Sequence, residues 1–215
     1  MIDQAAALNN AEWCDALCRA HGLPGVFSET VWTNPVRTPV FYPDAVTLSP
    51  EATAAEVLAG IDAGPGASVK DSFAALDLAA AGFGVLFEAT WIHRAAPGPG
   101  DVRGWAVVRE KDELAAWAEA CFDGEQPGLF PGGLLGEEDV AIVRGEEGGA
   151  VLNLSRRASV VGVSNVWGEA AWPGVVAMAA ALFPGLPLVG YEPDPAPAVA
   201  HGFVPAGPLR VWLKR

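Results

Sequence analysis

The feature that most constrains the fold is a succession of short apolar segments in the last third of the chain. Asp139–Gly145 and Ala150–Arg156 are rich in Val, Ile and Leu, and Glu146–Gly149 between them ends in two glycines, which is typical of a hairpin turn. Ala158–Val166 is a third apolar run, and its near-continuous hydrophobicity predicts a central strand that is covered on both faces. These segments predict three consecutive strands.

The period of the apolar residues then changes. Pro173–Phe183 has helical spacing, and Pro173 suits a first helical turn. Pro187–Tyr191 is a buried strand candidate, Asp194–His201 a short Ala-rich helix, and Leu209–Leu213 a last strand. This order contains one strand–helix–strand crossover beside an antiparallel meander, so it predicts an α/β protein with a mixed sheet.

This order resembles the second half of the GNAT superfamily of N-acetyltransferases, which bind acyl-CoA. Three features carry the resemblance: a strand that leads directly into the main helix at Pro173, a short helix that closes on Gly202-Phe203, and the final strand that begins after Gly207. The resemblance implies a GNAT-like fold, acetyl-CoA as the cofactor, and transfer of an acyl group to the amine of a small molecule or a protein.

The resemblance also implies the residues of the site. The acyl-CoA would lie along the third strand and the loop after it, at Val161, Val163, Ser164, Asn165 and Gly168. Backbone N–H groups near Val163 would hold the pantetheine and the carbonyl. Without the resemblance, Ser164 and Asn165 have a second interpretation, which is that they cap the next helix and close the turn.

Three residues are candidates for proton transfer in such a reaction. Glu88 or Glu192 would take the proton of the attacking amine, and Tyr191 would return a proton to the sulfur. Glu88 lies in the middle of an apolar strand candidate, so it is either a buried acid with a raised pKa or a residue of the exposed face. The alternation of the strand favours the exposed face.

Two departures from the family pattern support a second hypothesis. The loop 164–172 has one glycine, no Lys or Arg, and an acidic residue, Glu169, where phosphate charge would lie. Ala198 stands where the family often has a tyrosine. The alternative is therefore a catalytically inactive GNAT-like binding or regulatory module, for which a homodimer joined through an edge strand such as Leu209–Leu213 is expected.

The two ends of the chain are similar to each other. Ala63–Phe83 aligns with Phe183–Phe203 without a gap, and both segments end in Gly-Phe before a strand. This predicts a tandem of two related halves, residues 1–125 and 136–215, with 126–135 as a linker. The strand ends at Lys70 and Tyr191 would then form the walls of a shared cleft. Within the first half, 85–93 and 104–108 are predicted to pair as a hairpin.

Composition argues against several classes of partner. The net charge is −13 and the pI is about 4.5, which argues against nucleic acid and against an anionic membrane as partners. The longest apolar runs are too short to span a bilayer, and the first residues have no signal-like core. We therefore expect a cytoplasmic protein with a small-molecule ligand.

Two further segments have more than one interpretation. Cys14, Cys18 and His21 share one face of a helix predicted over Asn9–Ala20, but their spacing does not match a zinc site, so buried thiols and no metal are expected. The Pro-rich segment 23–50, with Phe41 and Tyr42, either lines a ligand cleft or packs as a strap on the core. Its length favours the strap.

Overall fold

The computed structural model describes residues 2–146 and 148–215, which form a mixed α/β structure around a single sheet. Its strands are β1 Val26–Phe27, β2 Val31–Thr33, β3 Ala45–Thr47, β4 Ser68–Asp71, β5 Phe83–Arg94, β6 Ala106–Val107, β7 Val140–Arg144, β8 Gly149–Ser155, β9 Val160–Trp167, β10 Leu188–Glu192 and β11 Val204–Lys214. Its helices are α1 Ile2–Ala20, α2 Ala54–Ala59, α3 Lys111–Cys121, α4 Ala171–Leu182 and α5 Ala196–Val199, with short 3-10 turns η1 Ala79–Ala81 and η2 Gly132–Gly136. The mixed sheet expected from the sequence is confirmed.

The last third of the chain has the predicted order. β7, β8 and β9 form an antiparallel meander, and β9 continues through α4 into the parallel strand β10. α4 crosses over one face of the sheet because its apolar residues, such as the fully buried Val175 and Ala179, pack there. The crossover predicted from the change of period is therefore confirmed.

The first part of the chain repeats this arrangement. β3 continues through α2 into the parallel strand β4, and η1 and β5 follow, just as α5 and β11 follow β10. The closing turns have the same geometry. Gly82 and Gly202 have φ values of 84° and 85°. The N–H of Phe83 donates to the carbonyl of Leu78, and the N–H of Phe203 donates to the carbonyl of Ala198, each at 3.2 Å. The aligned segments thus adopt the same local structure.

The two repeats exchange their last strands. The sheet has the order β1-β2-β3-β4-β11-β5-β10-β9-β8-β7-β6, so β5 pairs with β10 and β11 pairs with β4. β5 and β11 also pair with each other, antiparallel, with Leu209 opposite Ala89. Leu209 and Ala89 are corresponding positions of the repeat, so an approximate two-fold axis passes between them. Both side chains are buried at this centre.

Two expectations about strand pairing are wrong. β11 has a partner on each side, so Leu209–Leu213 is not an edge strand and cannot join two chains through its backbone. The homodimer itself stays a prediction. β6 pairs with β7 and not with β5, whose two sides are already occupied by β10 and β11. The division of the chain at 126–135 also stays a prediction.

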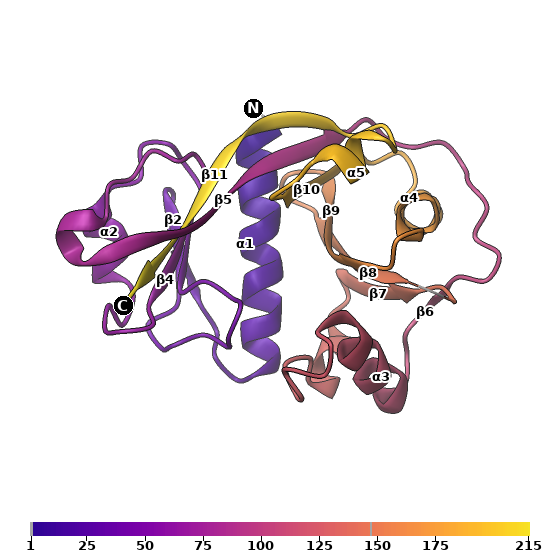
Figure 1. The fold of residues 1–215 in the computed structure, drawn as a ribbon, viewed down its shortest axis with the longest axis horizontal. Coiled ribbons are helices and arrows are strands. Elements are labelled where there is room, and N and C mark those ends of the chain that lie inside the picture. The colour runs from indigo at the N-terminus through magenta and orange to yellow at the C-terminus, as the bar shows by residue number, and fades with distance from the viewer. Residues whose placement is uncertain (1, 147) are drawn as a thin grey trace.

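α1 lies between two lobes, with β2, β4 and α2 on one side and β8–β10 and α4 on the other, while β5 and β11 bridge the lobes above it (Figure 1). Small buried residues such as Ala7 and Ala11 allow it to pack closely on strands of both lobes. α1 is longer than the predicted Asn9–Ala20. Asn9 does not cap it; its amide donates to the carbonyl of Asn153 (2.9 Å), and the Asn153 amide donates back to the carbonyl of Asn9 (3.0 Å).

No helix within residues 2–146 and 148–215 has the length and hydrophobicity needed to cross a membrane.

The repeat makes a matched prediction for its two closing glycines. Gly82→Ala and Gly202→Ala should each lower the free energy of unfolding by about 1–2 kcal/mol, because an L residue is strained in the left-handed conformation. Gly84→Ala, in extended backbone with nothing within 4 Å of the added Cβ, is the control and should change stability by less than about 0.5 kcal/mol. Urea denaturation measures all three. An unaffected Gly82 or Gly202 variant would contradict the shared turn geometry.

Candidate functional site

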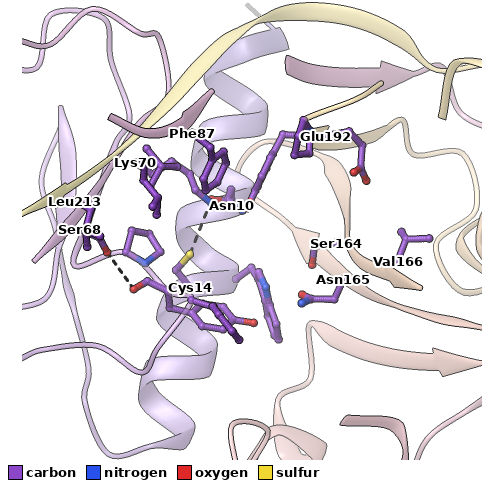
Figure 2. A pocket seen from close by; sticks show the side chains of 18 residues that line it. Asn10, Cys14, Ser68, Lys70, Phe87, Ser164, Asn165, Val166, Glu192 and Leu213 are labelled. Atoms are coloured by element: carbon purple, nitrogen blue, oxygen red, sulfur yellow. Dashed lines mark hydrogen bonds between the residues drawn. The ribbon is translucent and has the colours of Figure 1, made fainter. Parts of the chain in front are cut away.

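A cavity with a volume of about 420 Å³ lies between the two lobes. It is lined by residues from α1, from the segment 41–43, and from β4, β5, β9, β10 and β11. In Figure 2, Ser68 and Lys70 lie on one side of α1, and Ser164, Asn165 and Glu192 lie on the other. Both halves of the repeat therefore contribute to one site.

The cavity exists because two neighbouring parallel strands diverge. β9 and β10 pair only as far as Gly162 and Val189, although the strands continue to Trp167 and Glu192. Gly190 lies at the point of divergence, where an added Cβ would come within 2.6 Å of the carbonyl oxygen of Val163. The carboxyl ends of parallel strands are where α/β sheets commonly bind ligands.

A buried lysine lies at the centre of one wall. The Nζ of Lys70 donates to the Oδ1 of Asn10 (2.8 Å) and to the hydroxyl of Tyr191 (3.1 Å), and it lies 4.2 Å from the centroid of the Tyr191 ring. Lys70 is 4% exposed. Cys14 lies beside this cluster and donates weakly to the same Asn10 oxygen. Burial raises the pKa of the Cys14 thiol to about 11, so Cys14 is protonated at neutral pH.

Glu192 is the acidic residue of the opposite wall. It ends β10, where burial and then the nearby negative charge of Asp194 raise its pKa to about 7. At neutral pH the Glu192 carboxyl is therefore present in both protonation states. A group whose pKa is close to the working pH can both accept and release a proton, which is the property required of a general base.

Ser164 and Asn165 lie at the end of β9, on the Glu192 side of the cavity. The Oγ of Ser164 is buried and has no hydrogen-bond partner among the described residues. Asn165 has a φ of 51°, which bends the strand, and its carbonyl accepts a weak hydrogen bond from Cys121. Neither side chain caps α4, whose N-cap residue, Ala170, has no side-chain hydrogen bond. Both side chains are therefore available to a ligand.

The other predicted site residues lie outside the cavity. The side chains of Val161 and Val163 are buried in the core, and the N–H of Val161 donates to the carbonyl of Pro187 (3.0 Å) within the sheet. Gly168 belongs to the exposed turn before α4. Glu88 lies on the exposed face of β5, where Arg210 donates to its carboxylate (2.7 Å).

Sequence reasoning missed Asn10, and for the segment of Tyr42 it gave the lining of a cleft only as the less favoured interpretation. Asn10 is a polar residue on the buried face of α1, and that position was the only available signal. Tyr42 lies in the Pro-rich segment, which lines the cavity through residues 41–43 instead of acting only as a strap. Burial raises the pKa of the Tyr42 phenol well above its usual value, and the hydroxyl has no partner among the described residues.

Cys18 is a buried thiol, and the ring of His21 bonds to the carbonyl of Leu129 (2.8 Å).

Solved structures share this fold. A putative acetyltransferase of the GNAT family from Novosphingobium aromaticivorans superposes with a TM-score of 0.57 at 16% identity, over 97% of this chain and 99% of that one. A Drosophila protein superposes with a TM-score of 0.50 at 14% identity, over 97% and 89% of the two chains. No protein-family model matches the sequence. A search of curated proteins also gives no match.

These similarities extend over nearly the whole chain, including the first half, which the internal repeat had predicted to be GNAT-like. The GNAT-like fold expected from the last third of the chain is thus confirmed for the molecule as a whole.

The raised pKa of Glu192 predicts a pH-dependent stability. The native state holds the proton up to about pH 7, whereas the unfolded chain releases it near the ordinary glutamate pKa of 4.5, so stability falls as pH rises between these values. Glu192→Gln removes this loss and should stabilise the protein by about 1–3 kcal/mol at pH 8 and by almost nothing at pH 4.5. Urea denaturation at both pH values tests this, with the exposed Glu119→Gln as control. Equal effects at the two pH values would exclude a raised pKa at Glu192.

Proposed function

We propose that this protein is an acyl-CoA-dependent N-acyltransferase that transfers an acyl group to an amine. The observation that carries the proposal is Glu192, a carboxyl group with a pKa of about 7 in a cavity at the diverging ends of β9 and β10. The GNAT-like fold supports the class of reaction. An amine nucleophile requires a base that works at neutral pH, and Glu192 has that property.

The residues around the cavity fit the reacting part of an acyl-CoA. The Oγ of Ser164 is a buried group without a partner, so it can donate a hydrogen bond to a carbonyl oxygen at the end of β9. Gly190 keeps the space between the strands free of side-chain atoms. When bound, acyl-CoA supplies an activated acyl group as a thioester.

The proposed roles of the side chains follow from their positions. Glu192 accepts the proton that the amine loses as the new C–N bond forms. Tyr191 is the nearest hydroxyl on the same strand end, and it gives its proton to the sulfur as the C–S bond breaks. Lys70 donates to the Tyr191 oxygen and holds it in place. The aromatic and aliphatic lining, which includes Trp13 and Phe87, limits the access of water.

A thermal-shift titration with acetyl-CoA, beside free CoA and pantetheine, tests binding. We expect a saturable rise in Tm with acetyl-CoA. Activity is then measured by release of free CoA in the presence of a panel of amines. No shift with millimolar acetyl-CoA, together with no release of CoA, would overturn the proposal.

The role of Glu192 makes a kinetic prediction. Glu192→Gln should lower kcat by about 10²–10⁴-fold, because the base is lost. In the unmodified protein, kcat/KM should rise with pH and level off above an apparent pKa near 7, as the carboxylate forms. Glu119→Gln, on the exposed side of α3, should retain both the rate and the pH profile. A pH profile that is identical with and without Glu192 would contradict its assignment as the base.

The second candidate function is a binding module without acyl transfer. The observation that favours it is the turn before α4, where Glu169 is exposed and where residues 164–172 include no Lys or Arg to pair with a pyrophosphate. Ala198 is fully buried and offers no hydroxyl group. Binding of a ligand to the cavity with no release of CoA from any amine would favour this function.

A further inference from the structure

Lys70 is a buried cation whose observed partners are all neutral. Its ammonium bonds to an amide oxygen and a phenol, Asn10 and Tyr191, and no carboxylate oxygen of the described residues lies within 4.0 Å of it. By contrast, the partly buried Arg37 pairs with Asp44. A buried ammonium is costly unless an anion compensates its charge. Within residues 2–146 and 148–215, no carboxylate forms an ion pair with Lys70.

Two acidic residues from the strands around Lys70, Asp71 and Asp44, have other partners. Asp71, the next residue, accepts the backbone N–H of Leu76 (2.8 Å). Asp44 pairs with Arg37 and accepts the N–H of Ser68 (2.8 Å). The chain has 26 acidic residues and 13 basic ones, so carboxylates are not scarce in this protein. The lack of a carboxylate partner among the described residues is therefore a property of the Lys70 site and not of the composition.

Two polar groups of the cavity lining have hydrogen-bonding capacity that the described residues do not use. An ammonium group has three N–H donors, and two of them are used by Asn10 and Tyr191. The hydroxyl of Tyr42, which lines the same cavity, is buried and without a partner among the described residues. Buried polar groups are normally satisfied, so two independent groups indicate a polar ligand in this cavity.

The two walls of the cavity have complementary chemistry. Lys70 and Glu192 both line it, Lys70 from β4 and Glu192 from the end of β10, and they lie on opposite sides of α1 in Figure 2. A molecule that has both a carboxylate and an amine carries groups that are complementary to the two residues. A volume of about 420 Å³ is sufficient for a ligand of this size.

We propose that the acceptor is a free amino acid, whose carboxylate binds Lys70 with the help of the Tyr42 hydroxyl and whose amine faces Glu192. The identity of the amine as the acceptor rests on the proposed function. The carboxylate site does not rest on the proposed function, because it is argued from Lys70 and Tyr42 alone. A carboxylate could also come from a dicarboxylic acyl group, such as succinyl, and the experiment separates the two sources.

The test is calorimetric binding of free amino acids and of their amides to the full chain, without acyl-CoA. The amides retain the amine and the side chain but lack the carboxylate. We expect at least one amino acid to bind, its amide to bind at least 10-fold more weakly, and Lys70→Met to remove this difference. Tyr42→Phe should weaken binding less, by about 2–10-fold, as expected for one lost hydrogen bond. Lys111→Met, on the surface, should bind as the unmodified protein does.

Thermal melting shows whether Lys70→Met is folded; if it is not, Tyr42→Phe and the comparison of acids with amides still decide the question. Absence of binding by every amino acid, or equal binding of acids and amides, would overturn the inference. So would binding of succinyl-CoA that depends on Lys70 while amino acids do not bind. Acylation of amino acids and of their amides at equal rates would overturn the inference but leave the proposed function intact. Binding of amino acids that depends on their carboxylate, with no acyl transfer, would support the carboxylate site but overturn the proposed function.

Discussion

The pairing of β5 with β11 is the interaction on which the rest of the structure depends. Each of these strands ends one repeat, and each completes the sheet of the other repeat by pairing with β10 or β4. Without the exchange, the inner edges of β4 and β10 would leave their backbone groups unpaired in the interior of the molecule. The same exchange brings Lys70 and Tyr191, from different repeats, within hydrogen-bonding distance and encloses the cavity above α1.

The sequence predicted what is encoded locally. Hairpin glycines, changes of apolar period and the Gly-Phe stop predicted the order of elements from β7 to β11, and the alignment of Ala63–Phe83 with Phe183–Phe203 predicted two related halves. It did not predict which strand lies beside which. The alternation along Phe83–Arg94 is the same whether its partner is β6 or β11, because alternation specifies the faces of a strand and not its neighbours.

The site was predictable to a similar extent. Tyr191, Glu192, Ser164 and Asn165 line the cavity because they lie at strand ends, which an element order can locate. Asn10 contributes through the packing of α1, a contact between distant parts of the chain that no local pattern encodes. Residues marked by strand position thus reached the cavity, and those that depend on long-range packing were missed.

The approximate two-fold axis between Ala89 and Leu209 has a consequence for how this site arose. Two identical copies of one repeat could build the same sheet as a symmetric pair, but their two strand ends would then be chemically identical. When the two copies are joined in one chain, corresponding positions can hold different residues. Here Lys70 corresponds to Gly190, and Ser72 corresponds to Glu192. One chain can therefore place a cationic group at one strand end and an acidic group at the other, which a symmetric pair could not do without duplicating both.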